Sequence, residues 1–151
     1  MGSEAASLAM IGWREWVALP ALGVHTIKAK IDTGARSSAL HAFEVEQFER
    51  DGQLMVRFQA HPIQRNDTVI VAAEAPLLDQ RVVRNSGGQE QLRPVIETPV
   101  QVGNQVWPIE LTLTNRDDMG FRLLLGRQAV RYRYLVDPGG SYLQPLAECS
   151  S

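Results

Sequence analysis

The sequence contains a single cysteine, Cys149, and only two lysines, Lys28 and Lys30. One cysteine cannot form an intrachain disulfide, which excludes a small disulfide-stapled secreted scaffold and is consistent with a reducing compartment. No apolar run approaches the roughly 18 residues of a membrane-spanning helix, and the start of the chain lacks the basic and apolar regions of a signal peptide. These absences predict a cytoplasmic protein with no membrane partner.

The chain has an ordinary size and composition for one globular domain. Its 151 residues are enough to bury a core without a metal or disulfide, and 44% hydrophobic with 21% charged residues argue against disorder. The 17 acidic and 15 basic residues nearly balance, giving a formal net charge of -2. This balance provides no general attraction to nucleic acid, so we expect a single domain over 1–151 without a nucleic-acid partner.

The basic residues are strongly biased towards arginine, which accounts for all of them except Lys28 and Lys30. The planar guanidinium group pairs with carboxylates and phosphates through two parallel hydrogen bonds. Arginines gathered in a cleft would therefore favour an anionic ligand. The alternative is a compositional bias of the genome, which would produce the same excess of arginine.

The hydrophobic pattern is mostly that of β-strands separated by turns. Strand-like segments occupy 25–32, 67–75 (closed by Pro76), 79–84, 92–102 and 106–114, and hairpins are expected at 48–58, around Asp51-Gly52, and at Gly103-Asn104. Helical patterns are confined to 126–133 and, more weakly, to 37–43. Many short strands with intervening turns indicate a mainly β barrel or sandwich.

The sharpest local motif is Asp32-Thr33-Gly34, followed by Ala35, at the end of the predicted strand 25–32. A simple Asp-Gly-type turn that ends a strand would also account for this tripeptide. The motif gains meaning from the order of the later segments of the chain. A glycine-tipped hairpin over 83–93 comes next, then the turn at Gly103-Asn104, and then Leu-Leu-Gly-Arg at 124–127 before a short helix.

This order resembles that of a retropepsin, the single-lobe aspartic protease. More closely, the sequence resembles the bacterial family often labelled "putative ATP-dependent zinc protease", which is itself retropepsin-like. The resemblance spans about 12–138, and its matching stretches are 12–15, 29–35, 86–88 with 93–95, 111–116, 124–127 and 136–138. It implies a mainly β, retropepsin-like (acid protease) closed barrel of one lobe, with one short C-terminal helix.

The zinc and ATP parts of that label find no support in the residues. No glycine-rich loop followed by Lys and Ser or Thr is present, and no His-Glu-x-x-His motif occurs. The three histidines, His25, His41 and His61, stand 16 and 20 residues apart. Cys149 lies in a polar tail without a local base. The sequence therefore predicts no metal and no cofactor, and a zinc-dependent hydrolase is the least favoured alternative.

Aspartic peptidase chemistry needs two carboxyl groups, one acting as a base and the other, protonated, polarising the carbonyl. The chain contains one Asp-Thr-Gly loop, because none of the other aspartates repeats the motif. A single copy must find its partner across a two-fold axis, which a homodimer supplies. We therefore expect catalysis only from a homodimer.

The resemblance also implies a role for each residue of the loop. Asp32 would be the catalytic carboxylate, paired with Asp32 of the other subunit. Thr33 would hydrogen-bond across the axis, Gly34 would donate its N–H to the carboxylate, and Ala35 would complete the catalytic loop. A flap made of Ser86, Gly87 and Gly88 would close over the substrate, the alternative being an ordinary solvated hairpin.

One departure from the retroviral pattern concerns substrate charge. In retroviral relatives the position two after the loop glycine is acidic and pairs with the arginine of the Gly-Arg motif. Here that position is Arg36, so Arg127 needs another partner and both arginines can face the cleft, unless Arg36 pairs with a nearby acid. We therefore expect a substrate-binding set of Arg36, Ser86, Gly87, Gly88, Arg93 and Arg127.

Members of this family are associated with peptide ligases that append glutamate to proteins, so the resemblance implies an acidic peptide or protein tail as substrate. The alternative from another functional class is a catalytically silent module that recognises a peptide or a ligase partner on the same fold. The intact Asp32-Thr33-Gly34-Ala35 loop favours the enzyme.

Overall fold

The computed structural model describes residues 8–63, 68–84, 87–115 and 120–145, and over these ranges the chain is almost entirely β. Its elements are β1 Ala9–Leu19, the 3-10 turn η2 Pro20–Leu22, β2 Val24–Asp32, β3 Ser38–His41, β4 Phe43–Arg50, β5 Gln53–Ala60, β6 Val71–Arg84, β7 Glu90–Val102, β8 Gln105–Thr114, β9 Leu123–Gly126, α1 Arg127–Val130 and β10 Tyr134–Ser141. The predicted mainly β class with one short helix near the C-terminus is confirmed.

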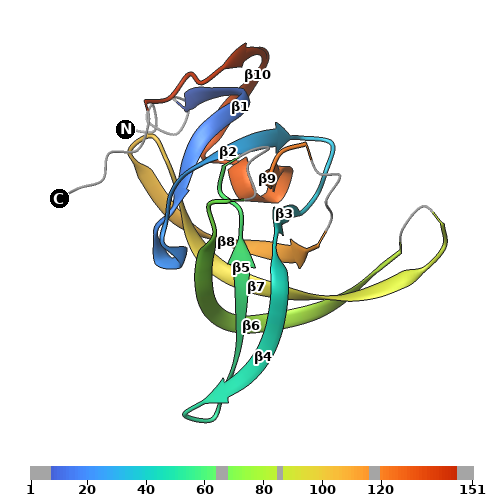
Figure 1. The fold of residues 1–151 in the computed structure, drawn as a ribbon. Coiled ribbons are helices and arrows are strands. Elements are labelled where there is room, and N and C mark those ends of the chain that lie inside the picture. The colour runs from blue at the N-terminus through green and yellow to red at the C-terminus, as the bar shows by residue number, and fades with distance from the viewer. Residues whose placement is uncertain (1–7, 64–67, 85–86, 116–119, 146–151) are drawn as a thin grey trace.

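Six of the strands close into a barrel (Figure 1). The sheet order is β10-β1-β2-β9-β3-β8-β7-β6-β5-β4, and a further pairing of Ala18 with Gln101 joins β1 to β7. The ring therefore runs β1-β2-β9-β3-β8-β7, with β10 outside it at one end and β6, β5 and β4 at the other. This closed, single-lobe barrel agrees with the retropepsin-like fold expected from the sequence.

The barrel interior is filled by aliphatic side chains from alternate positions of its strands. In β2, for example, Ile27, Ala29 and Ile31 are buried, while the residues between them are exposed or half-buried. This alternation is the two-residue period of a half-buried strand, and it fixes which side chains of β2 point away from the core.

The predicted break at Pro76 is wrong, because β6 runs without interruption from Val71 to Arg84. Pro76 pairs with Met55 at the last position that β6 shares with β5, and Leu77 then pairs with Ile96 of β7. Proline cannot donate a ladder hydrogen bond, and it is tolerated here because the strand changes partner at this point.

The weak helix prediction over 37–43 is also wrong. This segment forms β3, which pairs in parallel with β8 and antiparallel with β9. Its backbone groups are satisfied by two strands that lie far away in the sequence, so tertiary pairing overrides a weak local preference. The predicted helix 126–133 is shortened to the four residues of α1, because Arg131 adopts an extended backbone and Tyr132 a positive φ of 67° on the way into β10.

Two strands that the periodicity analysis did not predict, β1 and β10, lie side by side near the ends of the described chain (Figure 1). A Cβ added to Gly12 would lie 2.1 Å from the carbonyl oxygen of Gly140, so only glycine permits this contact. The fully buried Glu15 carboxylate accepts hydrogen bonds from the N–H groups of Gly12, Leu143 and Gln144 at 2.7, 2.7 and 3.1 Å. Glu15 thereby ties the segment after β10 to β1.

Candidate active site

The Asp32 loop begins where β2 leaves the barrel. The N–H of Ala35 donates to the carbonyl oxygen of Asp32 at 3.1 Å, which closes a tight turn. Within this turn the N–H of Gly34 donates to Oδ1 of Asp32, also at 3.1 Å, as the resemblance implied. Asp32 is half-buried, while Thr33 and Gly34 are exposed. The turn therefore orients the carboxylate and leaves it accessible from the surface of the single chain.

The start of α1 holds this loop from the other side. The N–H groups of Arg127 and Gln128 donate to the carbonyl oxygens of Ala35 and Arg36 at 2.8 and 3.2 Å. These N–H groups belong to the first turn of a helix, where no intrahelical partner exists, so the loop carbonyls satisfy them. The Asp32 loop and the Gly-Arg turn are therefore brought together by backbone hydrogen bonds, although they lie about 90 residues apart in the sequence.

Arg127 finds its partner in the backbone rather than in an acid. Its Nη1 atom donates to the carbonyl oxygen of Gly34 at 3.3 Å. Arg36 is exposed, and among the described residues no carboxylate lies within ion-pair distance of it. The structure thus places both arginines beside the Asp32 loop, and Arg36 forms no ion pair with a described acid.

Three of the other predicted substrate residues, Gly87, Gly88 and Arg93, lie on the long β6–β7 hairpin, which extends away from the barrel as an arm (Figure 1). Gly87 and Gly88 are exposed near its tip, and Gly88 adopts a positive φ of 83°. Ser86 lies outside the described residues. Arg93 sits directly across from Arg81 on this arm, where its guanidinium donates two hydrogen bonds to Gln91 Oε1, at 3.1 and 3.0 Å.

The histidines do not form a metal centre in the described part of the chain. The rings of His41 and His61 stack with centroids 6.1 Å apart, and Phe43 stacks on His61 at 4.5 Å. His25 lies on β2, which β9 separates from β3, the strand that carries His41. Within the described ranges, no group of three or more His, Cys, Asp or Glu side chains could hold a metal ion. Cys149 lies outside the described residues.

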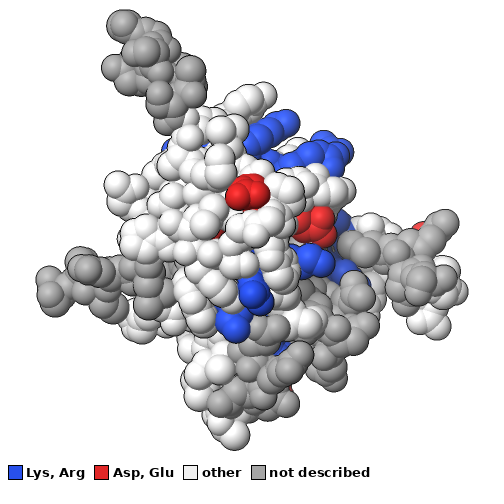
Figure 2. Space-filling view, turned by 90° about the horizontal axis from the view of Figure 1, so that it is seen from above, with Lys and Arg blue, Asp and Glu red and all other residues white. Residues whose placement is uncertain are grey.

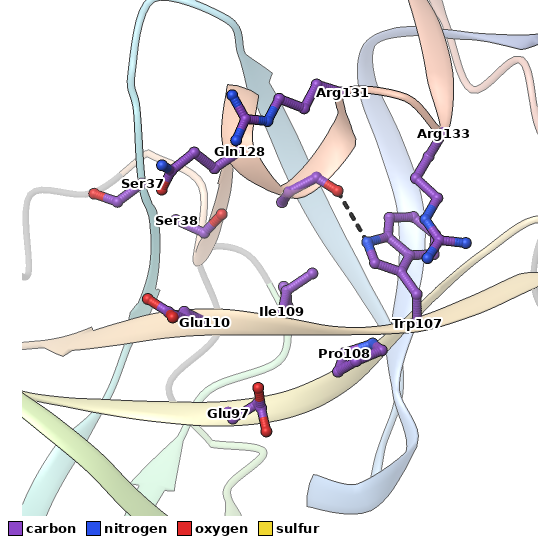
Figure 3. Close-up of a pocket in the computed structure, with 11 residues that line it drawn as sticks. Ser37, Ser38, Glu97, Trp107, Pro108, Ile109, Glu110, Gln128, Arg131 and Arg133 are labelled. Carbon is purple, nitrogen blue, oxygen red and sulfur yellow. Dashed lines mark hydrogen bonds between the residues drawn. The ribbon is translucent and has the colours of Figure 1, made fainter.

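A cavity of about 400 Å³ lies beside the loop, on the flank where α1 faces β7 and β8 (Figure 3). Ser38 and Gln128 line it at one side and the glutamates Glu97 and Glu110 at the other, and Arg131, the residue after α1, also lines it. The Asp32 carboxylate does not line this cavity. Sequence reasoning did not foresee it, because its residues converge only through the barrel closure.

A larger hollow of about 750 Å³ lies between η2 and strands β4 to β6, and it too is not lined by Asp32. Neither of these two hollows therefore includes the Asp32 carboxylate. No helix in the described ranges is long and apolar enough to cross a membrane.

The chain has close relatives that are much longer than itself. It is 49% identical over 133 residues to a protein named probable alpha-L-glutamate ligase from Parasynechococcus marenigrum (strain WH8102). The matched segment makes up 88% of this chain and 28% of that protein. A protein of the same name from Shewanella pealeana (strain ATCC 700345 / ANG-SQ1) is 47% identical over 133 residues, covering 88% and 29%. The chain thus spans less than a third of the length of these curated relatives.

The fold is also shared with a solved structure. A crystal structure of a protein of unknown function from Legionella pneumophila (strain Philadelphia 1) matches with a TM-score of 0.74 and 30% sequence identity, covering 91% of this chain and 98% of that chain.

A protein family described as "Retropepsin-like aspartic endopeptidase RimB" matches residues 10–147. The match takes in the Asp32 loop, the β6–β7 arm and the Gly126-Arg127 turn. The description names aspartic chemistry, and the zinc label that accompanied the resemblance is not confirmed. The chain therefore belongs to the RimB-like family of retropepsin-like proteins.

Proposed function

We propose that this domain is an aspartic peptidase that acts as a homodimer, with Asp32 of each subunit forming the catalytic pair. The observation that carries the proposal is the Asp32 loop itself. Its carboxylate is accessible at the end of a barrel strand, oriented by the Gly34 N–H and held by the start of α1.

The chemistry requires two neighbouring carboxyl groups that share one proton, since two carboxylates about 3 Å apart cannot both be ionised. The ionised group takes a proton from water, whose oxygen bonds to the peptide carbonyl carbon, while the protonated group donates to the carbonyl oxygen. Collapse of this tetrahedral intermediate breaks the C–N bond, and the amine leaves with a proton. One chain supplies one such carboxyl, so a two-fold axis through the loop supplies the second.

The proposed substrate is an acidic peptide or protein tail that contains glutamate. Two observations support it. Arg36 and Arg127 flank the Asp32 loop, and guanidinium groups pair well with carboxylates. Relatives of this chain are named for attaching glutamate, and a peptidase on the same segment would remove what such a ligase adds.

The second candidate is a module that binds a glutamate-containing tail, or the ligase, without cutting. It is favoured by the same relatives, in which the matching segment makes up less than a third of proteins named as ligases. In this alternative the accessible loop would contribute to recognition rather than to hydrolysis.

Hydrolysis of a glutamate-tailed peptide in heavy-oxygen water separates the two candidates. The peptidase account expects two fragments by mass spectrometry, one of which carries a single heavy oxygen in its new carboxyl group. Cleavage should persist in the presence of a chelator and disappear in Asp32→Asn. Binding of the peptide without any fragment, at protein concentrations that give a dimer, would favour the silent module instead.

A further inference from the structure

A row of cationic side chains leads along the barrel surface to Asp32. Because Ile27, Ala29 and Ile31 of β2 point into the core, Lys28, Lys30 and Asp32 share the opposite face of the same strand. The only two lysines of the protein therefore lie on the face that carries the candidate catalytic carboxylate.

The neighbouring strand adds a third cation to this row. The β1–β2 register places Arg14 directly opposite Lys30 and Trp16 directly opposite Lys28. Cross-strand neighbours have Cβ atoms about 4.5–5.5 Å apart, and same-face neighbours along a strand are about 6.6 Å apart. Lys30 is thus the same-face neighbour of Asp32 on β2, and Arg14 lies beside Lys30 on β1. We call Arg14, Lys28 and Lys30 the strand cation row.

No acid neutralises the strand cation row within the described ranges. None of its three members takes part in an ion pair there, although other arginines do. Like charges placed directly opposite each other on a sheet are destabilising. The direct Arg14–Lys30 pairing therefore costs stability in the free protein, and an anion bound between the two side chains would offset that cost.

Aromatic rings position two of the three cations. The Arg14 guanidinium lies over the rings of Trp13 and Tyr142, at 4.7 and 5.1 Å, and its Nε donates to Ser141 Oγ at 3.1 Å. The Lys28 ammonium lies 5.3 Å from the ring of Trp16. Side chains that are held before binding lose less conformational entropy when they contact a ligand, so this arrangement favours binding.

The charge of this side of the molecule agrees with that arrangement. Figure 2 shows the protein from above, the side on which β10, β1 and β2 lie, and more Lys and Arg atoms than Asp and Glu atoms are visible there. The chain as a whole is slightly acidic, with a formal net charge of -2. The excess of basic over acidic atoms visible on this side therefore contrasts with the slightly negative charge of the whole chain.

We propose that the strand cation row is the subsite that recognises carboxylate side chains of the substrate next to the bond that is cut. This inference rests on the proposed peptidase function and adds Arg14, Lys28 and Lys30 to Arg36 and Arg127 as residues that would favour an acidic substrate. An extended peptide repeats its same-face side chains every 6–7 Å or so, which matches the spacing of Lys28 and Lys30. A peptide with glutamates on both sides of the scissile bond fits this row.

Binding to the full-length Asp32→Asn protein tests the subsite without turnover. The probe is a fluorescein-labelled hexaglutamate peptide, with a hexaglutamine peptide of equal length as the neutral comparison. Lys30→Met and Arg14→Met should each weaken hexaglutamate binding about tenfold or more, while Arg14→Lys should retain much of it. Arg131→Met is the matched control, because it removes one exposed positive charge from the residue that follows α1. It should leave the affinity unchanged.

Four results would overturn the subsite. Equal losses in Arg131→Met would mean that only net charge matters. Equal binding of hexaglutamine would remove the carboxylate preference. Competition by a single-stranded oligonucleotide as strong as that by unlabelled hexaglutamate would indicate a nucleic-acid surface. Loss of the dimer in Lys30→Met or Arg14→Met by sedimentation would assign the row to the subunit interface.

Cleavage assays separate this inference from the proposed function. If an otherwise unmodified protein cuts glutamate-rich peptides and Lys30→Met cuts them equally well, the subsite is wrong and the peptidase stands. If the protein cuts no peptide, but hexaglutamate binding still depends on Arg14 and Lys30, the peptidase is wrong and the recognition of carboxylates stands.

Discussion

The α-carbon of Gly126 faces the carbonyl oxygen of Ser37 so closely that a methyl group there would lie 2.4 Å from that oxygen. The same methyl group would lie 2.8 Å from the carbonyl oxygen of Ala35. The Gly126 N–H also donates to Ser38 Oγ at 3.0 Å. Because both crowded atoms belong to the backbone that follows Asp32, Gly126 sets how closely the Asp32 loop packs on β9.

Gly126→Ala should therefore displace the backbone of the Asp32 loop, because the new methyl group would overlap the carbonyl oxygens of Ser37 and Ala35. Overpacking of this kind costs about 1–3 kcal/mol of stability, and a shift of about 1 Å at a reactive group costs on the order of 100-fold in rate. Thermal unfolding and peptide hydrolysis measure the two effects. The control is Gly139→Ala, where the new Cβ would meet Asp137 Oδ1 at an ordinary 3.6 Å. Equal losses of thermal stability and of hydrolysis rate in Gly126→Ala and Gly139→Ala would contradict the packing argument.

Asp32→Asn should abolish hydrolysis and leave the fold intact. The asparagine Oδ1 can still accept the Gly34 N–H, so stability should change by less than about 1 kcal/mol, while loss of the acid–base group should lower the rate on the order of 1,000-fold.

Asp137→Asn is a closely matched control for this variant. Asp137 Oδ1 accepts the N–H of Gly139 at 2.9 Å, the same local pattern as Asp32 and Gly34, but away from the loop. The Asp137→Asn variant should therefore retain full peptidase activity. Retained turnover in Asp32→Asn, measured on the same peptide, would exclude the aspartic mechanism.

Glu15→Gln should destabilise the protein without changing the contacts of the Asp32 loop. The buried carboxylate accepts three backbone N–H groups, whereas an amide has one acceptor oxygen and would turn its NH₂ towards at least one of those donors. A buried donor left unsatisfied costs about 1–3 kcal/mol, which urea unfolding would detect. Glu110→Gln, which removes an exposed ion pair with Arg81, should cost less than about 1 kcal/mol.

Tyr134 makes stability sensitive to alkaline pH. Burial raises the pKa of its hydroxyl above the ordinary 10.0, the Glu15 carboxylate raises it further, and a hydrogen bond with Gln105 partly opposes both. The folded state therefore holds this proton more tightly than the unfolded state. The contribution of the protonated Tyr134 hydroxyl to the free energy of unfolding is complete below about pH 10. It is lost as the pH rises from there through the folded-state pKa.

Tyr134→Phe tests this relationship. Losing the 2.6 Å hydrogen bond from the hydroxyl to the carbonyl oxygen of Val102 should cost about 1 kcal/mol at neutral pH. Above pH 10 the variant should lose stability less steeply than the unmodified protein, as followed by unfolding at a series of pH values. Tyr132→Phe, at a residue that is 83% exposed, should not change the slope. Identical slopes for all three proteins would contradict the account.

Local sequence signals predicted the elements that depend on neighbouring residues. The turn at Asp51-Gly52 was predicted because both positions need a positive φ, and both adopt one, at 53° and 80°. The alternation in 25–32 likewise predicted β2 and the face that carries Lys28, Lys30 and Asp32. These features require no knowledge of distant segments.

The elements that the sequence missed depend on contacts between distant residues. Strand β3 exists because β8 and β9 flank it, and β10 pairs with β1 across more than 100 residues of sequence. Within the candidate site, the resemblance predicted that Arg36 and Arg127 can face one cleft, and Arg127 does contact the Asp32 loop through the carbonyl oxygen of Gly34. The approach of His41 to His61, and the position of Arg14 opposite Lys30, follow only from the register of the folded sheet.

The central claim is that two subunits share one catalytic site, and subunit mixing tests it most directly. A fixed amount of unmodified protein is mixed with increasing Asp32→Asn protein, allowed to exchange subunits, and assayed on a glutamate-rich peptide. With about nine variant subunits for each unmodified one, random pairing leaves about a tenth of the unmodified subunits paired with each other. The account predicts that activity falls about tenfold at this ratio, and activity that stays constant as the variant is added would contradict it.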